Sequence, residues 1–283
     1  MNTLKTIVLL GLLSALMIAV GGIAGGKSGL ILAFFFALAT NIFAYWFSAP
    51  MALRMSNAQP IAREQAPDLY RIVEHLATEA KIPMPTVHFI PSDSPNAFAT
   101  GRDPEHSAIA VTRGILDLLD AGELEAVLAH ELGHVRNRDI LISSIAAVLA
   151  ACVTTVAHWG MYLGAGEDDR GNRANPIFLL LMAIAAPIAA SMINLAISRS
   201  REYEADATGA RICGHPLALA SALAKIEAQA QQIPMYDANP ALSSLYIVKP
   251  VRNNWMMNLF STHPPIPERI KRLQEMNYLG KSD

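Results

Sequence analysis

Charged residues are scarce in this chain. Only 16% of its 283 residues are Asp, Glu, Lys or Arg, whereas 52% are hydrophobic. A soluble globular domain normally carries about 25% charged residues. The shortage of charge therefore excludes an ordinary soluble fold for the whole chain, and it predicts that part of the chain lies in lipid.

The chain also has few cysteines and a small net charge. The chain has 2 cysteines, too few for the dense disulfide framework of a small secreted domain. We expect Cys152 and Cys213 to be free, buried thiols. The formal net charge is −2, and no basic stripe with interleaved aromatic residues is present. Nucleic acid is therefore not an expected partner.

The chain contains four long uncharged runs. They are Thr6–Gly26, Ser28–Leu53, Ile140–Ala157 and Ile177–Ile197. A spanning helix needs about 20 apolar residues, so these runs predict four transmembrane helices arranged as two hairpins. A cleaved signal peptide is the alternative for the first run. The second run follows directly after Lys27, which favours a hairpin.

Basic residues flank these runs unevenly. If the four helices alternate in direction, one side of the membrane holds only Lys27, Arg170 and Arg173. The other side holds Lys5, Arg54, Arg63, Arg136, Arg138, Arg199 and Arg201. Cytoplasmic flanks carry the excess of Lys and Arg, so we expect this second side, which includes both chain ends, to face the cytoplasm.

The predicted domain organisation follows from the runs. Residues 1–53 form a first membrane hairpin and residues 140–197 a second one. Residues 54–139 and 198–283 lie on the same side of the membrane. We do not expect either block to fold as a separate domain. We therefore expect the two blocks to build one α+β domain, interrupted in sequence by the second hairpin.

The first block contains signals for a helix and a small sheet. Apolar residues recur at helical spacing between Leu69 and Ala80. Two short β-branched stretches, Thr86–Ile90 and Ala108–Thr112, predict strands. An exposed strand edge can hydrogen-bond an extended peptide whatever its sequence. An ordinary sheet covered by helices fits these residues equally well.

The chemical signal is the motif His-Glu-Leu-Gly-His at residues 130–134. Asp120 is a good N-cap for the helix that would carry it. Histidines four apart lie on one helix face, so both imidazoles can bind one metal ion beside Glu131, as in zinc hydrolases. If this helix runs straight on through Asp139 into the third apolar run, His134 lies about 9 Å from the first membrane residue, which would place the metal close to the bilayer.

Helix alignment narrows the search for a third metal ligand. If the third and fourth spans are antiparallel neighbours, residues at equal distances from their cytoplasmic ends lie at the same level. His130 and His134 are then level with residues 207 and 203. Glu202 and Glu204 both lie in this window, and the alignment does not separate them.

A family resemblance covers nearly the whole chain. H-E-L-G-H at 130–134, followed after a hydrophobic hairpin by E-Y-E-A-D at 202–206, resembles the membrane-integral zinc metallopeptidases of the HtpX type, relatives of the CaaX prenyl endopeptidases. P-N-A-F-A-T-G at 95–101 and H-P-P at 263–265 extend the likeness. Four spans match the bacterial branch. The resemblance implies a mainly α membrane protein of the bacterial inner membrane, with a cytoplasmic, gluzincin-like α+β protease domain.

The same resemblance implies the roles of individual residues. One zinc ion is expected on His130, His134 and Glu202. Asp206, four residues after Glu202, then shares its helix face and can accept the free ring N–H of a zinc-bound histidine. Three protein ligands leave a fourth zinc position for water, and Glu131 is the expected general base.

Residues further from the motif are candidates for binding the substrate or stabilising the oxyanion. The stretch that contains Asn96, Phe98 and Ala99 resembles the segment leading into the family's substrate-binding edge strand. His263 could stabilise the oxyanion, and it could equally be a turn residue before the last helix.

The leading functional hypothesis is an endopeptidase that cleaves misfolded or membrane proteins at the cytoplasmic face, in membrane protein quality control and the stress response. Its expected partners are protein substrates and the lipid bilayer. A processing enzyme with narrow specificity for lipid-modified C-termini is the alternative. A metal-stabilised scaffold without catalysis is a third hypothesis, but a scaffold needs no base such as Glu131 beside an open zinc position.

Overall fold

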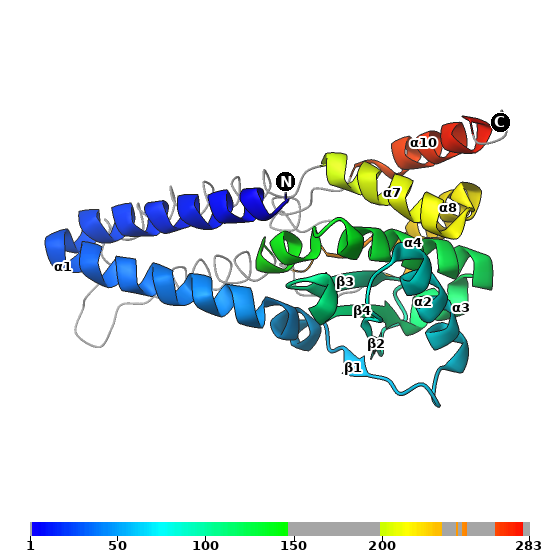
Figure 1. The fold of residues 1–283 in the computed structure, drawn as a ribbon, viewed down its shortest axis with the longest axis horizontal. Coiled ribbons are helices and arrows are strands. Elements are labelled where there is room, and N and C mark those ends of the chain that lie inside the picture. The colour runs from blue at the N-terminus through cyan, green and yellow to red at the C-terminus, as the bar shows by residue number, and fades with distance from the viewer. Residues whose placement is uncertain (1, 147–198, 234–241, 243–244, 248–263, 280–283) are drawn as a thin grey trace.

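A long helical hairpin and a compact α+β domain make up the described part of the chain (Figure 1). The computed structural model describes residues 2–146, 199–233, 242, 245–247 and 264–279. The principal elements are α1 Asn2–Met55, β1 Gln59–Pro60, α2 Pro67–Ala80, β2 Thr86–Ile90, β3 Ala97–Gly101, β4 Ser107–Thr112, α3 Arg113–Leu118, α4 Ala121–Arg136, α7 Arg199–Cys213, α8 Pro216–Gln232 and α10 Ile266–Leu279.

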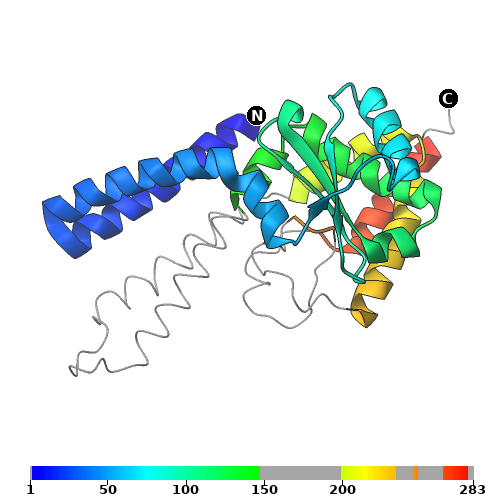
Figure 2. The same cartoon turned by 90° about the horizontal axis from the view of Figure 1, so that it is seen from below.

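The hairpin is formed by α1 and projects away from the domain in both views (Figures 1 and 2). Non-helical backbone at Gly25 and Gly26 divides α1 into two helices. Thr6–Ile23 and Gly25–Met55 are each long and apolar enough to cross a membrane. The first predicted hairpin is therefore present, with its turn beginning at Gly25.

Close packing holds the two helices of the hairpin together. A Cβ on Gly29 would overlap the carbonyl oxygen of Gly21, so only glycine allows this approach. Asn41 Nδ2 also donates a hydrogen bond to Ser14 Oγ at 2.9 Å. This polar contact ties the helices at a point where lipid offers no competing partner.

The second predicted hairpin lies largely outside the described residues. From the run Ile140–Ala157, the structure describes a helix that begins at Ile140 and is followed to Ala146. Ile177–Ile197 and Cys152 lie outside the described part. The arrangement of four spans, their orientation and the domain boundaries stay predictions.

The sheet has four strands in the order β1-β2-β4-β3. The two predicted strands are confirmed as β2 and β4, which pair in parallel with Thr86 opposite Ala108. The stretch between them also contains β3, which pairs antiparallel to β4 with Ala99 opposite Ile109. β3 is an edge strand, and all its residues are buried.

Helices cover the sheet in successive layers (Figures 1 and 2). α4 packs against both β3 and α7, while α8 packs against both α4 and α10. The predicted helix of the first block is confirmed as α2, whose apolar face is buried in the main core. The two halves of the domain, separated in sequence by residues 140–197, thus meet at the contact of α4 with α7.

α4 begins at the predicted N-cap, but it ends before the third apolar run. Asp120 and Glu123 form a complete capping box at its start. At its end, Arg138 has a left-handed backbone with φ 59, and the N–H groups of Arg138 and Asp139 bond to the carbonyls of Val135 and His134. This pattern is a Schellman motif, which ends a helix. The helix that carries the motif therefore does not run unbroken into the third apolar run, and a new helix begins at Ile140.

Two glycines let α4 and α7 touch backbone to backbone. A Cβ on Gly209 of α7 would lie 2.7 Å from the backbone nitrogen of His130 and 2.8 Å from its Cα. On the α4 side, a Cβ on Gly133 would lie 3.1 Å from the carbonyl oxygen of Ala205. Any side chain at Gly209 must push α7 away from the helix that carries the H-E-x-x-H motif.

We therefore expect Gly209→Ala to destabilise the protein by about 1–3 kcal/mol, the usual cost of overpacking a core. Gly122→Ala on α4 is the matched control, because the nearest atom to its Cβ is Asp120 Oδ1 at 3.6 Å. Thermal unfolding of the full chain in detergent measures both variants. Equal unfolding temperatures for the two variants would contradict the contact.

Candidate metal centre

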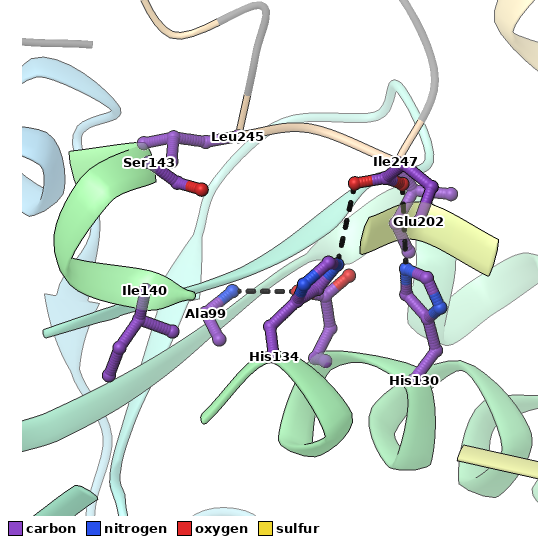
Figure 3. Close-up of a pocket in the computed structure, with 9 residues that line it drawn as sticks. Ala99, His130, His134, Ile140, Ser143, Glu202, Leu245 and Ile247 are labelled. Carbon is purple, nitrogen blue, oxygen red and sulfur yellow. Dashed lines mark hydrogen bonds and ion pairs between the residues drawn. The ribbon is translucent and has the colours of Figure 1, made fainter. Parts of the chain in front are cut away.

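Three potential metal ligands converge where α4 crosses α7 (Figure 3). His130 and His134 come from α4, and Glu202 comes from the first turn of α7. His130 Nε2 lies 3.9 Å from Glu202 Oε2, and His134 Nε2 lies 3.6 Å from Glu202 Oε1. One ligand atom from each residue can be chosen so that all three lie within 4.8 Å of one another.

The spacing of these atoms fits a metal ion. Bonds of about 2.0–2.1 Å in a tetrahedral zinc site put ligand atoms about 3.4 Å apart. The two histidine–glutamate distances exceed that by a few tenths of an ångström and end on different oxygens of Glu202, so side-chain rotations would have to bring the ligand atoms closer together. Two imidazoles and a carboxylate are also a donor set that zinc accepts.

A carboxylate lies close to the Nδ1 atom of each histidine and orients its ring. His130 Nδ1 lies 2.9 Å from Asp206 Oδ1, and His134 Nδ1 lies 3.1 Å from Asp139 Oδ2. Carboxylates that accept the Nδ1–H proton leave Nε2 free to bind a metal. The structure thus places Asp206 at the predicted position and adds Asp139, which the sequence analysis missed. Asp139 reaches His134 because the Schellman turn folds it back.

The structure separates Glu202 from Glu204. Glu202 is 5% exposed and faces the two histidines (Figure 3), whereas Glu204 is exposed. Residues two apart on a helix point in different directions. Glu202 and Asp206 are four apart and share the buried face that meets α4.

Glu131 is buried beside the same centre and faces the sheet. It is 3% exposed, and its Oε2 accepts a hydrogen bond from the Ala99 N–H at 2.8 Å. Burial raises the pKa of Glu131 to about 7, in the range where a carboxyl group can exchange protons near neutral pH. A dication bound nearby would shift this pKa downwards, because positive charge favours the carboxylate.

Nearby charges also set the protonation of His134 and Asp206. Burial opposes the charged form of His134, but the hydrogen bond with Asp139 and the charge of Glu202 raise its pKa to about 9. A metal ion at Nε2 takes the place of that proton. Burial also opposes the charged form of Asp206, yet Arg269 lowers the pKa of Asp206 to about 2.

Arg269 is the residue that sequence reasoning did not place. It comes from α10, is 0% exposed, and donates two hydrogen bonds to Asp206, from Nε at 2.9 Å and from Nη2 at 2.7 Å. A signal was available in the sequence. Arg269 lies three residues after Ile266 and four before Leu273, so it is a charged residue on the apolar face of a predicted helix.

The predicted substrate-binding residues lie on or beside β3. Asn96 is buried, and its Oδ1 accepts the N–H groups of Ala97 at 3.2 Å and Ile247 at 3.0 Å. Phe98 packs edge-on against Tyr246, with ring centroids 5.6 Å apart. Ala99 borders the metal centre. His263 lies outside the described residues.

A small hollow opens over the metal centre. Its cavity volume is about 20 Å³, which is room for little more than one water molecule. Apolar walls come from the start of the Ile140 helix and from the segment 245–247. The residues that line it are Ala99, His130, Glu131, His134, Ile140, Ser143, Glu202, Leu245 and Ile247.

We expect Asp139→Asn to weaken zinc binding by about 10-fold, because an amide holds the His134 tautomer less firmly than a carboxylate does. Competition with a chromophoric chelator measures the affinity. Asp103→Asn is the matched control, since Asp103 Oδ1 contacts His106 Nδ1 at 2.6 Å on an exposed turn. Equal zinc affinities for the two variants would remove Asp139 from the site.

Comparison with known proteins identifies the family. Residues 63–277 match the model of peptidase family M48. A protein named as a protease HtpX homolog from Burkholderia multivorans is 49% identical, with 100% of this chain and 99% of that protein covered. One from Pelotomaculum thermopropionicum is 50% identical, with coverages of 98% and 99%.

A solved structure shares the fold. The crystal structure of S. mikatae Ste24p aligns with a TM-score of 0.52 at 17% sequence identity, and the match covers 96% of this chain and 65% of that one. At this identity the likeness concerns the fold alone. The match to the family model and the full-length identity of the relatives confirm the resemblance seen in the motifs. The chain therefore belongs to peptidase family M48.

Proposed function

We propose that this chain is a zinc-dependent endopeptidase of the bacterial inner membrane that cleaves misfolded or membrane proteins at the cytoplasmic face. One observation carries the proposal. The buried carboxylate of Glu131 lies in the same hollow as His130, His134 and Glu202, and it also bonds to the Ala99 N–H of an edge strand. A base, a metal site and a peptide-binding edge thus meet at one point.

Each residue of the centre has a chemical task in this proposal. A zinc ion held by His130, His134 and Glu202 would supply Lewis acidity to the scissile carbonyl. Glu131 takes a proton from the attacking water and returns it to the nitrogen of the leaving amine. Asp139 and Asp206 hold the two imidazoles in the tautomer that binds metal.

β3 is the proposed binding edge for the substrate. Its partner β4 occupies one side, and the Ala99 N–H points to the other side, towards Glu131. The Gly101 N–H also points outwards, to Ser144 Oγ at 3.5 Å. An extended peptide beside this edge would be held by its backbone, and the apolar walls at Leu245 and Ile247 suit an apolar side chain.

Contacts between the hairpin and the sheet support a membrane substrate. The hairpin α1 touches β3, and the guanidinium of Arg102 lies 4.7 Å from the ring centroid of Trp46. Ala52 of the hairpin also belongs to the same core cluster as Phe98. The proposed binding edge is therefore attached directly to the two helices that are apolar enough to enter a bilayer.

We expect Glu131→Gln to lower the rate of peptide hydrolysis by about 100- to 10,000-fold, the usual contribution of a general base, while zinc stays bound. Glu125→Gln is the matched control, because Glu125 lies on the same helix and faces His75 at 3.8 Å instead of the hollow. The assay uses an unfolded protein substrate with purified enzyme in detergent. Full activity of Glu131→Gln would refute the proposed mechanism.

Chelation tests the metal. A chelator should abolish hydrolysis, and added zinc should restore it, whereas calcium should not, since calcium prefers six to eight oxygen ligands. Activity that survives exhaustive chelation, with no metal in the sample by elemental analysis, would rule out a metallopeptidase reaction at this site.

Mapping of the cleavage products tests the substrate range. Backbone recognition by an edge strand predicts cuts at many unrelated internal positions in misfolded and membrane proteins, identified by mass spectrometry. A single cut near lipid-modified C-termini, with other proteins left intact, would instead establish the narrow processing activity.

A further inference from the structure

We propose that Arg269 is a positioning residue of the metal centre, which fixes Asp206 and Glu202 and thereby makes the C-terminal helix α10 part of the site. The inference rests on the proposed metal-dependent function. It assigns Arg269 no contact with substrate, since the arginine acts through the residues that hold the metal.

Three helices meet at the guanidinium. Arg269 of α10 donates to both carboxylate oxygens of Asp206 on α7, and its Nη2 lies 3.4 Å from His130 Nε2 on α4. Its Nη1 lies 3.8 Å from Glu202 Oε2. Arg269 therefore contacts His130 and attracts Glu202, which are two of the proposed ligands. It also hydrogen-bonds to the carboxylate of Asp206, which orients His130.

The shape of the contact is specific to arginine. The planar guanidinium grips Asp206 through two parallel hydrogen bonds, which fixes the carboxylate plane as well as its position. That plane decides where Asp206 Oδ1 meets His130 Nδ1, at 2.9 Å. A lysine ammonium is a point charge with no such fork, so it could keep the charge and lose the orientation.

The remaining donor of Arg269 points to the ligand. Within the described part of the chain, Nη1 is a buried donor with no hydrogen-bond acceptor. A buried donor that stays unbonded costs about 1–3 kcal/mol. Nη1 instead faces Glu202 Oε2. The positive charge of the guanidinium attracts this oxygen, which lies on the His130 side of Glu202.

Docking of α10 does not by itself require this arginine. Ile266 and Leu273 are buried on the same face of α10 and belong to the main core. A buried ion pair is often no more stabilising than apolar residues of the same size. A charged pair on an otherwise apolar face is therefore better explained by the metal centre that it touches than by the stability of the fold.

The test uses the full chain in detergent with Arg269→Lys, and with Arg272→Lys as the matched control. Arg272 lies on the same helix, is about half exposed and packs over the ring of Tyr203. The readouts are zinc affinity by chelator competition, the visible spectrum of bound Co²⁺, and the unfolding temperature of metal-free protein. We expect Arg269→Lys to bind zinc about 10- to 100-fold more weakly with an altered Co²⁺ spectrum.

A second variant distinguishes a loss of zinc binding from a loss of folding. Asp206→Asn combined with Arg269→Met removes both charges of the buried pair, so neither charge is left without the other. We expect this double variant to fold and still to bind zinc at least about 10-fold more weakly. If neither variant folds, the pair is a requirement of the fold and the positioning role is rejected.

Other outcomes separate this inference from the proposed function. Wild-type zinc affinity and an unchanged Co²⁺ spectrum in Arg269→Lys would overturn the role of Arg269, even if the native chain cleaves protein. A native chain that binds zinc but cleaves nothing would refute the proposed function and leave the role of Arg269 standing. A native chain that binds no metal would overturn both.

Discussion

The backbone contact between α4 and α7 is the constraint on which the metal centre depends. Gly133 and Gly209 remove the side chains that would hold the helices apart. At that separation the Nε2 atoms of both histidines come within 4 Å of the Glu202 carboxylate. The contact also joins the two halves of the domain, which the sequence separates by an apolar segment. A site of this kind cannot form within either half alone.

Burial imposes the second condition, because each charge removed from water needs a partner. Asp206 is bonded to Arg269, and Asp139 is bonded to His134. Glu131 accepts a backbone N–H from β3. These partners hold the site in shape through contacts from four separate elements. These hydrogen bonds hold the buried side chains of the candidate centre in place.

Much of this protein followed from the sequence because the signals are local. The long apolar runs predicted the first hairpin, and short β-branched stretches predicted β2 and β4. The H-E-x-x-H motif placed two potential ligands on one helix face, and Asp120 marked where that helix begins. Helix alignment reduced the search for a third ligand to a short window. Spacing along a helix or strand determines each of these features, and spacing is visible in a sequence.

The tertiary structure decided what depends on contacts between distant segments. It chose Glu202 over Glu204, because only one face of α7 meets α4. It ended α4 at a Schellman turn whose left-handed residue is Arg138, where no glycine announces the turn. It made residues 97–101 an edge strand and brought Arg269 to Asp206 from 63 residues away. The sequence alone determined which residues could take part, but only packing decided which of them meet, because a buried charge takes its partner from whatever helix the fold puts beside it.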